Sequence, residues 1–139
     1  GENAPDSAAK EYENEILNFF GKNKVVFDLI FLGMGDDGHT ASLFPESKAL
    51  DISDRWVIEN YVEKMNAWRI TFTTKTINAA RDITFLISGI SKAEMLKNVL
   101  ETQSIIVPSQ MIQPSKGNLL WLIDEAAASE LSKKQSRSE

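Results

Sequence analysis

The chain has 139 residues, a net charge of −5 and no cysteine. This length suits one domain with a substantial core, and the negative charge argues against nucleic-acid binding, which needs a basic surface. The absence of cysteine excludes disulfides, thiolate zinc sites and cysteine nucleophiles. No apolar run reaches the roughly 18 residues that span a bilayer. Because the polar start also has no signal-peptide core, we expect no membrane partner and a cytoplasmic location.

Helices and strands are predicted to alternate along the chain. The first helix is expected from Pro5 to Gly21, because the apolar residues between them recur at helical spacing. Val25 to Leu32 is a nearly continuous apolar run, typical of a strand buried on both faces. Ser91 and Asp124 are expected to cap the last two helices. Further strands are predicted at 55–62, 68–73, 82–88 and 118–123, and further helices at 40–43, 74–80, 91–100 and 124–131.

This alternation predicts a single α/β domain over residues 1–139, with a largely parallel sheet and flanking helices. Residues 132–139 are polar and are expected to form a disordered tail. Parallel sheets place their sites at the carboxyl ends of strands. Two predicted strands end in glycine there, at Gly33 and Gly89, so we expect the functional residues to lie in the loops that follow.

The strongest local signal is the segment from Gly33 to Thr40 (GMGDDGHT), which contains the only histidine, His39. Glycines let the backbone turn sharply off a strand and let a ligand approach closely. If a helix begins after His39, its free N–H groups favour an anion and its dipole keeps the imidazole neutral, as a general base requires. Asp36 or Asp37 can orient the ring or a water molecule. A glycine-rich turn with a surface histidine would give the same pattern.

Two cations are candidate phosphate ligands. Lys92 lies in the first turn of a predicted helix after Gly89, where it opposes the helix dipole unless an anion bridges the two. Arg69 begins an alternating strand; if Ile70 and Phe72 face the core, Arg69 projects from the other face and can hold a phosphate with two hydrogen bonds. An exposed lysine and a solvated or ion-paired arginine are the simpler alternatives. The P-loop spacing is absent, and one histidine without cysteine argues against a metal site.

Four blocks of the sequence, in this order, resemble the 6-phosphogluconolactonase family. They are Gly33 to Pro45 (GMGDDGHTASLFP), Arg69 to Thr73 with Ile77 to Ala80, Ile87 to Ala93 (ISGISKA), and Pro108 to Gln110 with Gly117 to Ala126 (GNLLWLIDEA). The resemblance covers nearly the whole chain and implies a Rossmann-like fold. Family members begin with a strand and a Ser-Gly-Gly phosphate loop, which this sequence lacks. We therefore expect the C-terminal part of the family fold, with the missing N-terminal half or a second copy as a partner.

The resemblance implies hydrolysis of 6-phospho-D-glucono-1,5-lactone in the pentose phosphate pathway, with no metal or organic cofactor. His39 would be the general base for attack of water on C1, and Asp37 would orient the ring or the water. Backbone N–H groups near Gly38 would help to stabilise the oxyanion. The residues expected to bind the phosphate and the sugar are Arg69, Lys92, Gly33, Gly35 and Gly38.

Related glucosamine-6-phosphate deaminases share the G-x-D-G-H core but carry a glutamate just before the proline. Here Phe44 precedes Pro45, which favours lactone hydrolysis. A deaminase or isomerase-like enzyme stays an alternative hypothesis, as does an inactive sugar-phosphate-binding fragment. Because part of the family's site is missing from this sequence, we expect little activity from the isolated 139-residue chain.

Overall fold

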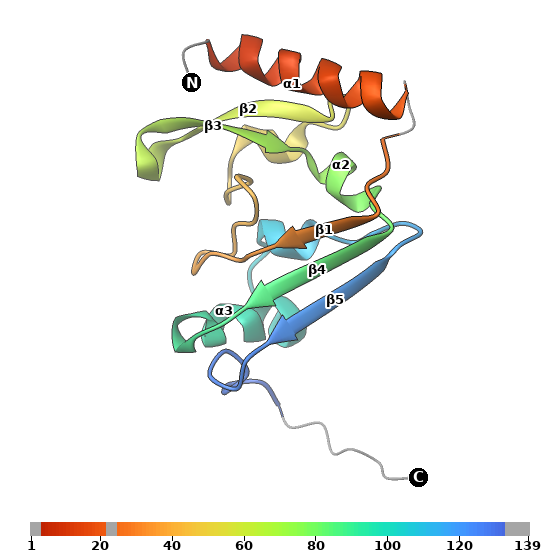
Figure 1. Ribbon diagram of the computed structural model, residues 1–139. Helices are drawn as coiled ribbons and strands as arrows, with labels where there is room; N and C mark the ends of the chain where they lie inside the picture. The colour runs from red at the N-terminus through yellow and green to blue at the C-terminus, as the bar shows by residue number, and fades with distance from the viewer. Residues whose placement is uncertain (1–3, 22–24, 133–139) are drawn as a thin grey trace.

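The computed structural model describes residues 4–21 and 25–132. Within these residues, five strands form two separate sheets (Figure 1). In the parallel sheet, β4 (Asp82–Ile87) lies between β1 (Leu29–Leu32) and β5 (Asn118–Ile123). The strands β2 (Val57–Val62) and β3 (Ala67–Phe72) pair as an antiparallel hairpin. The helices are α1 (Pro5–Phe20), α2 (Thr74–Asn78) and α3 (Ala93–Lys97), and α3 continues into a π-helical turn over Asn98–Thr102. The predicted α/β architecture, a mostly parallel sheet with flanking helices, is confirmed.

Helix α1 begins and ends where the local signals predict. Pro5 occupies its first turn, where a missing N–H costs nothing, and Gly21 ends it with a φ of 84° while its N–H donates to Leu17 O. Figure 1 shows that α1 lies across the hairpin rather than on the parallel sheet. Ala9 and Ile16 on its buried face pack with the hairpin residue Val57 in a small second core.

Glu13 fastens α1 to the start of β2. Its Oε1 accepts hydrogen bonds from the N–H groups of Trp56 (2.5 Å) and Val57 (3.2 Å), and its Oε2 accepts one from Arg55 Nε (2.6 Å). Burial by itself raises the pKa of the Glu13 carboxyl, but these hydrogen bonds and the charge of Arg55 outweigh it and hold the pKa below its usual value. Glu13 is therefore ionised in the folded protein, and its charge links α1 to the hairpin.

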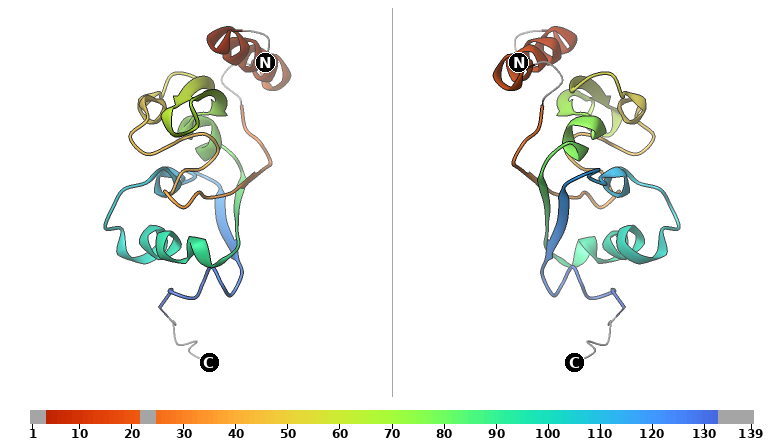
Figure 2. Two further views of the ribbon diagram at one scale, coloured as in Figure 1. Left: turned by 90° about the vertical axis from the view of Figure 1, so that its left-hand side faces the viewer. Right: turned by 90° about the vertical axis from the view of Figure 1, so that its right-hand side faces the viewer.

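The parallel sheet is covered on one face only. Figure 2 shows α3 and the segments around it on one side of the sheet, and no element of the described chain on the other. The covered face forms the main core, which includes Ile30, Ile83 and Phe85. The prediction that β1 is buried on both faces is wrong, because nothing among the described residues packs over alternate residues of this strand. The large apolar side chains exposed on the open face are Leu29, Phe31, Leu86, Leu120 and Leu122.

Three other local predictions also need correction. The first strand is shorter than expected, because only Leu29–Leu32 pairs with β4. Ser91 does not cap a helix: the chain turns at Gly89 through a 3₁₀ turn that leads directly into α3. Residues 125–130 form consecutive turns where a helix was predicted over 124–131, although Asp124 Oδ1 accepts from Ala127 N–H (2.7 Å) as a cap would.

The predicted tail at 132–139 lies outside the described residues except for Ser132. The backbone N–H of Ser132 donates to Glu101 Oε1 (2.9 Å), and its hydroxyl donates to Glu101 Oε2 (3.0 Å).

Candidate active site

The loop after β1 carries the histidine, and its conformation differs from the prediction. Instead of starting a helix, Thr40 and Leu43 form an isolated antiparallel bridge around a tight turn in which Ala41 has a φ of 49°. The Thr40 hydroxyl donates to Gly33 O (2.8 Å), which closes the loop onto the end of β1. The predicted helix dipole is therefore absent at His39, because tertiary hydrogen bonds fold these residues back on themselves. The tautomer of the imidazole is set by the hydrogen bonds of the ring instead.

His39 and Asp37 form a hydrogen-bonded pair. Asp37 Oδ1 lies 2.6 Å from His39 Nδ1 and also accepts from the His39 backbone N–H (3.1 Å). Partial burial by itself raises the pKa of the Asp37 carboxyl, but the hydrogen bonds and charge of His39, with the charge of Lys64, outweigh it and hold the pKa below its usual value. An ionised carboxylate only accepts hydrogen bonds, so Nδ1 carries a proton. In the neutral ring the lone pair is then on Nε2, the nitrogen opposite Asp37.

Two glycines make this pairing possible. A Cβ on Gly35 would lie 2.0 Å from His39 Nδ1 and 2.8 Å from Asp37 Oδ1, so only glycine leaves room for both groups. Gly38 has a φ of 78°, and a Cβ there would lie 2.6 Å from the Val107 side chain. By contrast, a Cβ on Gly33 would meet nothing within 4 Å. The structure thus gives Gly35 and Gly38 roles in shaping the loop, and the expected contacts of the three glycines with substrate stay a prediction.

Three backbone N–H groups around Gly38 are already used within the loop. Gly35 N–H donates to His39 O (2.9 Å) and Gly38 N–H donates to Gly35 O (3.0 Å). The N–H of His39 donates to the Asp37 side chain. These three donors have partners inside the turn, so any help to the oxyanion from N–H groups near Gly38 would have to come from other residues of the loop and stays a prediction.

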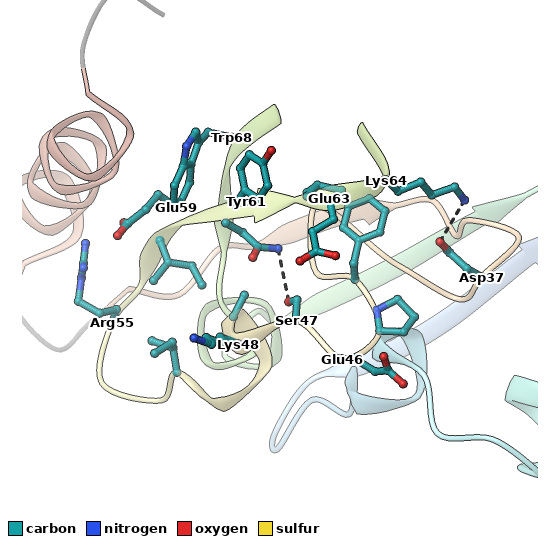
Figure 3. A pocket seen from close by; sticks show the side chains of 17 residues that line it. Asp37, Glu46, Ser47, Lys48, Arg55, Glu59, Tyr61, Glu63, Lys64 and Trp68 are labelled. Carbon is teal, nitrogen blue, oxygen red and sulfur yellow. Dashed lines mark hydrogen bonds and ion pairs between the residues drawn. The ribbon is translucent and has the colours of Figure 1, made fainter. Parts of the chain in front are cut away.

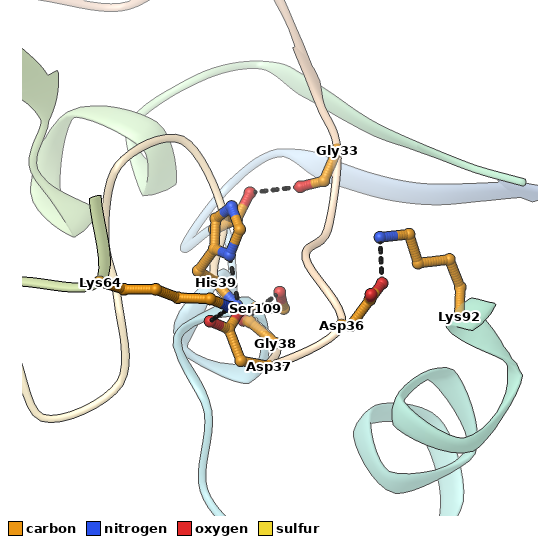
Figure 4. A network of polar contacts seen from close by, with 9 residues as sticks. Gly33, Asp36, Asp37, Gly38, His39, Lys64, Lys92 and Ser109 are labelled. Atoms are coloured by element: carbon orange, nitrogen blue, oxygen red, sulfur yellow. Dashed lines mark hydrogen bonds and ion pairs between the residues drawn. The ribbon is translucent and has the colours of Figure 1, made fainter. Parts of the chain in front are cut away.

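Two lysines approach the loop from different elements (Figure 4). Lys92, in the 3₁₀ turn before α3, pairs with the exposed carboxylate of Asp36. Lys64, at the tip of the β2–β3 hairpin, lies 3.4 Å from Asp37 Oδ2. The sequence predicted Lys92 as a site residue but missed Lys64, because no local pattern indicates a contact across 27 positions.

Arg69 lies on β3 without contacting the pair. Its Nη2 lies 3.7 Å from Met65 Sδ at the hairpin tip, and its side chain is exposed. The predicted burial pattern of β3, with Ile70 in the core and Thr71 outside it, is wrong at these two positions. Ile70 is 40% exposed, whereas Thr71 is 5% exposed and its hydroxyl accepts from Ser42 N–H (3.1 Å). The hairpin lies between α1 and the histidine loop, so both of its faces are contacted. Alternation places Arg69 on the same face as Thr71, toward that loop.

A distant segment fixes the histidine loop from behind. The N–H and the hydroxyl of Ser109, which is 1% exposed, both donate to Gly38 O, at 3.0 and 2.7 Å. Ser109 lies in a 3₁₀ turn (Pro108–Met111) whose approach is set by the buried Asn98. Asn98 Oδ1 accepts from Ser104 N–H (3.0 Å) and its Nδ2 donates to Ile105 O (2.9 Å). These hydrogen bonds attach the backbone of the loop to the segment behind it without any contribution from a ligand.

A cleft of about 890 Å³ opens beside the pair (Figure 3). Asp37 and Lys64 lie at one end, and Arg55 and Glu59 line the other, with Trp68 on its wall. Arg55 Nη2 and Glu59 Oε2 are buried without a hydrogen-bond partner among the described residues. The cleft is large enough to admit a sugar phosphate, and of the predicted site residues only Asp37 lines it.

Two further observations concern cofactors and membranes. Within residues 4–21 and 25–132, no three His, Cys, Asp or Glu side chains converge in a group that could hold a metal ion. No helix in this part of the chain combines the length and apolar character needed to cross a membrane.

Comparison with known proteins places these features in a family. The family model for glucosamine-6-phosphate isomerases and 6-phosphogluconolactonases matches residues 1–121. The chain belongs to this family. A 6-phosphogluconolactonase from Synechocystis is 42% identical over 132 residues, which cover 91% of this chain and 54% of that protein. The 6-phosphogluconolactonase of Rattus norvegicus is 40% identical over 129 residues, covering 91% and 50%.

Solved structures agree with the sequence matches. The 6-phosphogluconolactonase from Trypanosoma cruzi superposes with a TM-score of 0.82 and 30% identity, over 93% of this chain and 53% of that one. The predicted family and Rossmann-like fold are therefore confirmed. The chain spans about half the length of the curated relatives it matches.

Proposed function

We propose that this member of the 6-phosphogluconolactonase family hydrolyses 6-phospho-D-glucono-1,5-lactone to 6-phosphogluconate. The observation that carries the proposal is the 2.6 Å contact between Asp37 Oδ1 and His39 Nδ1 in the loop after β1. This contact places the lone pair of the neutral ring on Nε2, which has no hydrogen-bond partner among the described residues. The Asp37–His39 pair lies beside the cleft, which Asp37 lines. A lactone is an activated ester, so a water molecule and a neutral base suffice to open it.

The reaction needs one proton to move twice. Nε2 of His39 removes a proton from water as its oxygen attacks C1, which gives a tetrahedral intermediate and an imidazolium. The ionised Asp37 stabilises that imidazolium through Nδ1. When the intermediate collapses, the bond between C1 and the ring oxygen breaks, and Nε2 returns the proton to that oxygen. The product is the open-chain acid, and His39 is neutral again.

Cations around the loop would position the substrate through its phosphate. Lys92 is 25% exposed and is held near the loop by Asp36, so a phosphate would have to share or replace that carboxylate. Lys64 and Arg69 lie on the hairpin at the other side of the loop. Binding energy from a phosphate remote from C1 fixes the reacting carbon relative to the base.

The direct test is the substitution His39→Gln in a form of the protein that hydrolyses the lactone, with acid release followed in a pH-stat and corrected for spontaneous hydrolysis. General base catalysis contributes about 10² to 10⁴-fold, so kcat should fall by that factor while the fold is kept. A variant that hydrolyses the lactone at the wild-type rate would refute the role of His39.

The phosphate roles have a separate test. Lys92→Ala and Arg69→Ala should raise KM for the phosphorylated lactone more than for glucono-1,5-lactone, which has no phosphate. Asp36→Asn should lower KM for the phosphorylated lactone by up to about fivefold, because an exposed ion pair that competes for Lys92 is worth at most about 1 kcal/mol. Equal changes for both lactones would show that these cations do not bind the phosphate.

A further inference from the structure

We propose that Phe44 is a positioning residue of this site: its ring fixes the plane of the His39 imidazole and therefore the direction in which Nε2 points. The inference rests on the proposed role of His39 as the general base, and it adds a residue whose contact with His39 no local pattern of the sequence predicts.

The two rings form a stacked pair. Their centroids lie 4.1 Å apart and their planes differ by 21°, which is close to parallel. Asp37 contacts the ring at its edge, through Nδ1, whereas Phe44 contacts its face. A single hydrogen bond fixes one atom of the imidazole and leaves the ring free to tilt about it. The flat surface of Phe44 limits that tilt. The two contacts together therefore fix the direction in which Nε2 points.

Phe44 is itself held on both sides. Leu43 before it is fully buried in the main core, and its N–H donates to Thr40 O (2.9 Å). Pro45 after it restricts its backbone to extended conformations, and Phe44 O accepts from Ser47 N–H (3.2 Å). The phenyl ring is therefore anchored by the same short segment that carries His39. The orientation of the base is built into the loop and does not depend on a bound substrate.

Orientation of this kind has a direct effect on rate. A general base must come within about 2.6–3.2 Å of the proton that it removes, and a misplacement of about 1 Å can cost about 100-fold. Leucine in place of Phe44 would fill part of the volume but offers no flat face, so the imidazole could tilt away. Tyrosine would keep the flat face. The proposal therefore depends on the aromatic ring and not only on apolar bulk.

His39 is the only histidine of the chain, so its ring signals in NMR spectra are unambiguous. In the wild-type chain we expect nuclear Overhauser effects between the His39 and Phe44 ring protons, and upfield shifts of the His39 carbon-bound protons from the phenyl ring current. Phe44→Leu should remove the upfield shift, and Phe44→Tyr should retain it. Phe19→Leu is the matched control, because Phe19 lies on α1 and is 83% exposed. It should leave the His39 signals unchanged.

Kinetics complete the test. For Phe44→Leu we expect kcat to fall by about tenfold or more with KM nearly unchanged, and Phe44→Tyr should restore it. The inference is overturned if the wild-type chain lacks the His39–Phe44 Overhauser effects, a result that needs no variant to fold. It is also overturned if Phe44→Leu keeps the wild-type kcat. If His39→Gln leaves hydrolysis intact, the proposed role of His39 as general base fails instead, whatever the ring signals show.

Discussion

Gly35→Ala is expected to separate the Asp37–His39 pair without unfolding the protein. The new Cβ would lie 2.0 Å from His39 Nδ1 and 2.2 Å from Cε1. Carbon atoms in contact normally sit about 3.5 Å from their neighbours, so the ring must withdraw by about 1.5 Å. That movement breaks the 2.6 Å hydrogen bond to Asp37. A base displaced by more than 1 Å should lose about 100-fold or more in kcat.

Stability should change much less than activity in this variant. The pair is about 30% exposed on each side, so losing its hydrogen bond costs only about 1 kcal/mol. Gly35 is not among the residues with positive φ, so alanine fits the backbone and restricts the unfolded chain, which returns about 0.4–1 kcal/mol. Urea unfolding should therefore give a free energy within about 1 kcal/mol of the wild type.

Two other glycines serve as comparisons for Gly35→Ala. Gly33→Ala meets nothing within 4 Å and should leave the His39 NMR signals in place. Gly38→Ala combines a φ of 78° with a contact of 2.6 Å to Val107, and it should destabilise the fold by about 1–3 kcal/mol. If Gly35→Ala kept the wild-type His39 signals and kcat, the steric argument for the pair would be refuted.

Three further variants probe the pair and its supports. Glu13→Gln should cost about 2 kcal/mol of unfolding free energy at pH 7. The folded-state pKa of Glu13 is lowered, so this loss of stability should be present above pH 4.5 and should vanish as the pH falls through the folded-state pKa. Urea unfolding of both proteins at pH 7 and at a pH below that pKa will show the change. Asp37→Asn offers an amide donor to Nδ1, so ¹⁵N shifts should report the other tautomer and kcat should fall about 100-fold. Unchanged shifts would contradict that assignment. Ser109→Ala should cost about 1 kcal/mol, since its own N–H still donates to Gly38 O, and a loss above 3 kcal/mol in urea would contradict this.

The parts of the fold that follow from short-range signals were predicted from the sequence. Pro5 and Gly21 mark the two ends of α1 because proline and glycine act on their own backbone. The apolar runs of β4 and β5 gave their positions within one residue. The Asp37–His39 pair could also be expected, since two positions in one turn bring the side chains together.

The remaining features depend on contacts that span the chain. The turn at Thr40 is folded by hydrogen bonds to Gly33 O and from Ser42 N–H to Thr71, which override a helical pattern. Lys64 reaches Asp37 only because the hairpin is placed beside the loop. The open face of the parallel sheet was not predicted either, because an apolar strand indicates burial but not which element covers each face.

The anchoring of Gly38 by Ser109 has a consequence for folding. These residues lie 71 positions apart, and the Lys92–Asp36 pair closes over 56 positions. Contacts of such sequence separation form only after the chain has lost the entropy of closing long loops. The Asp37–His39 pair can meet early in its own turn, but the backbone that aims it is fixed only when the sheet is assembled. The native His39 resonances should thus appear at the rate of global folding, and the geometry of the base becomes a property of the whole domain.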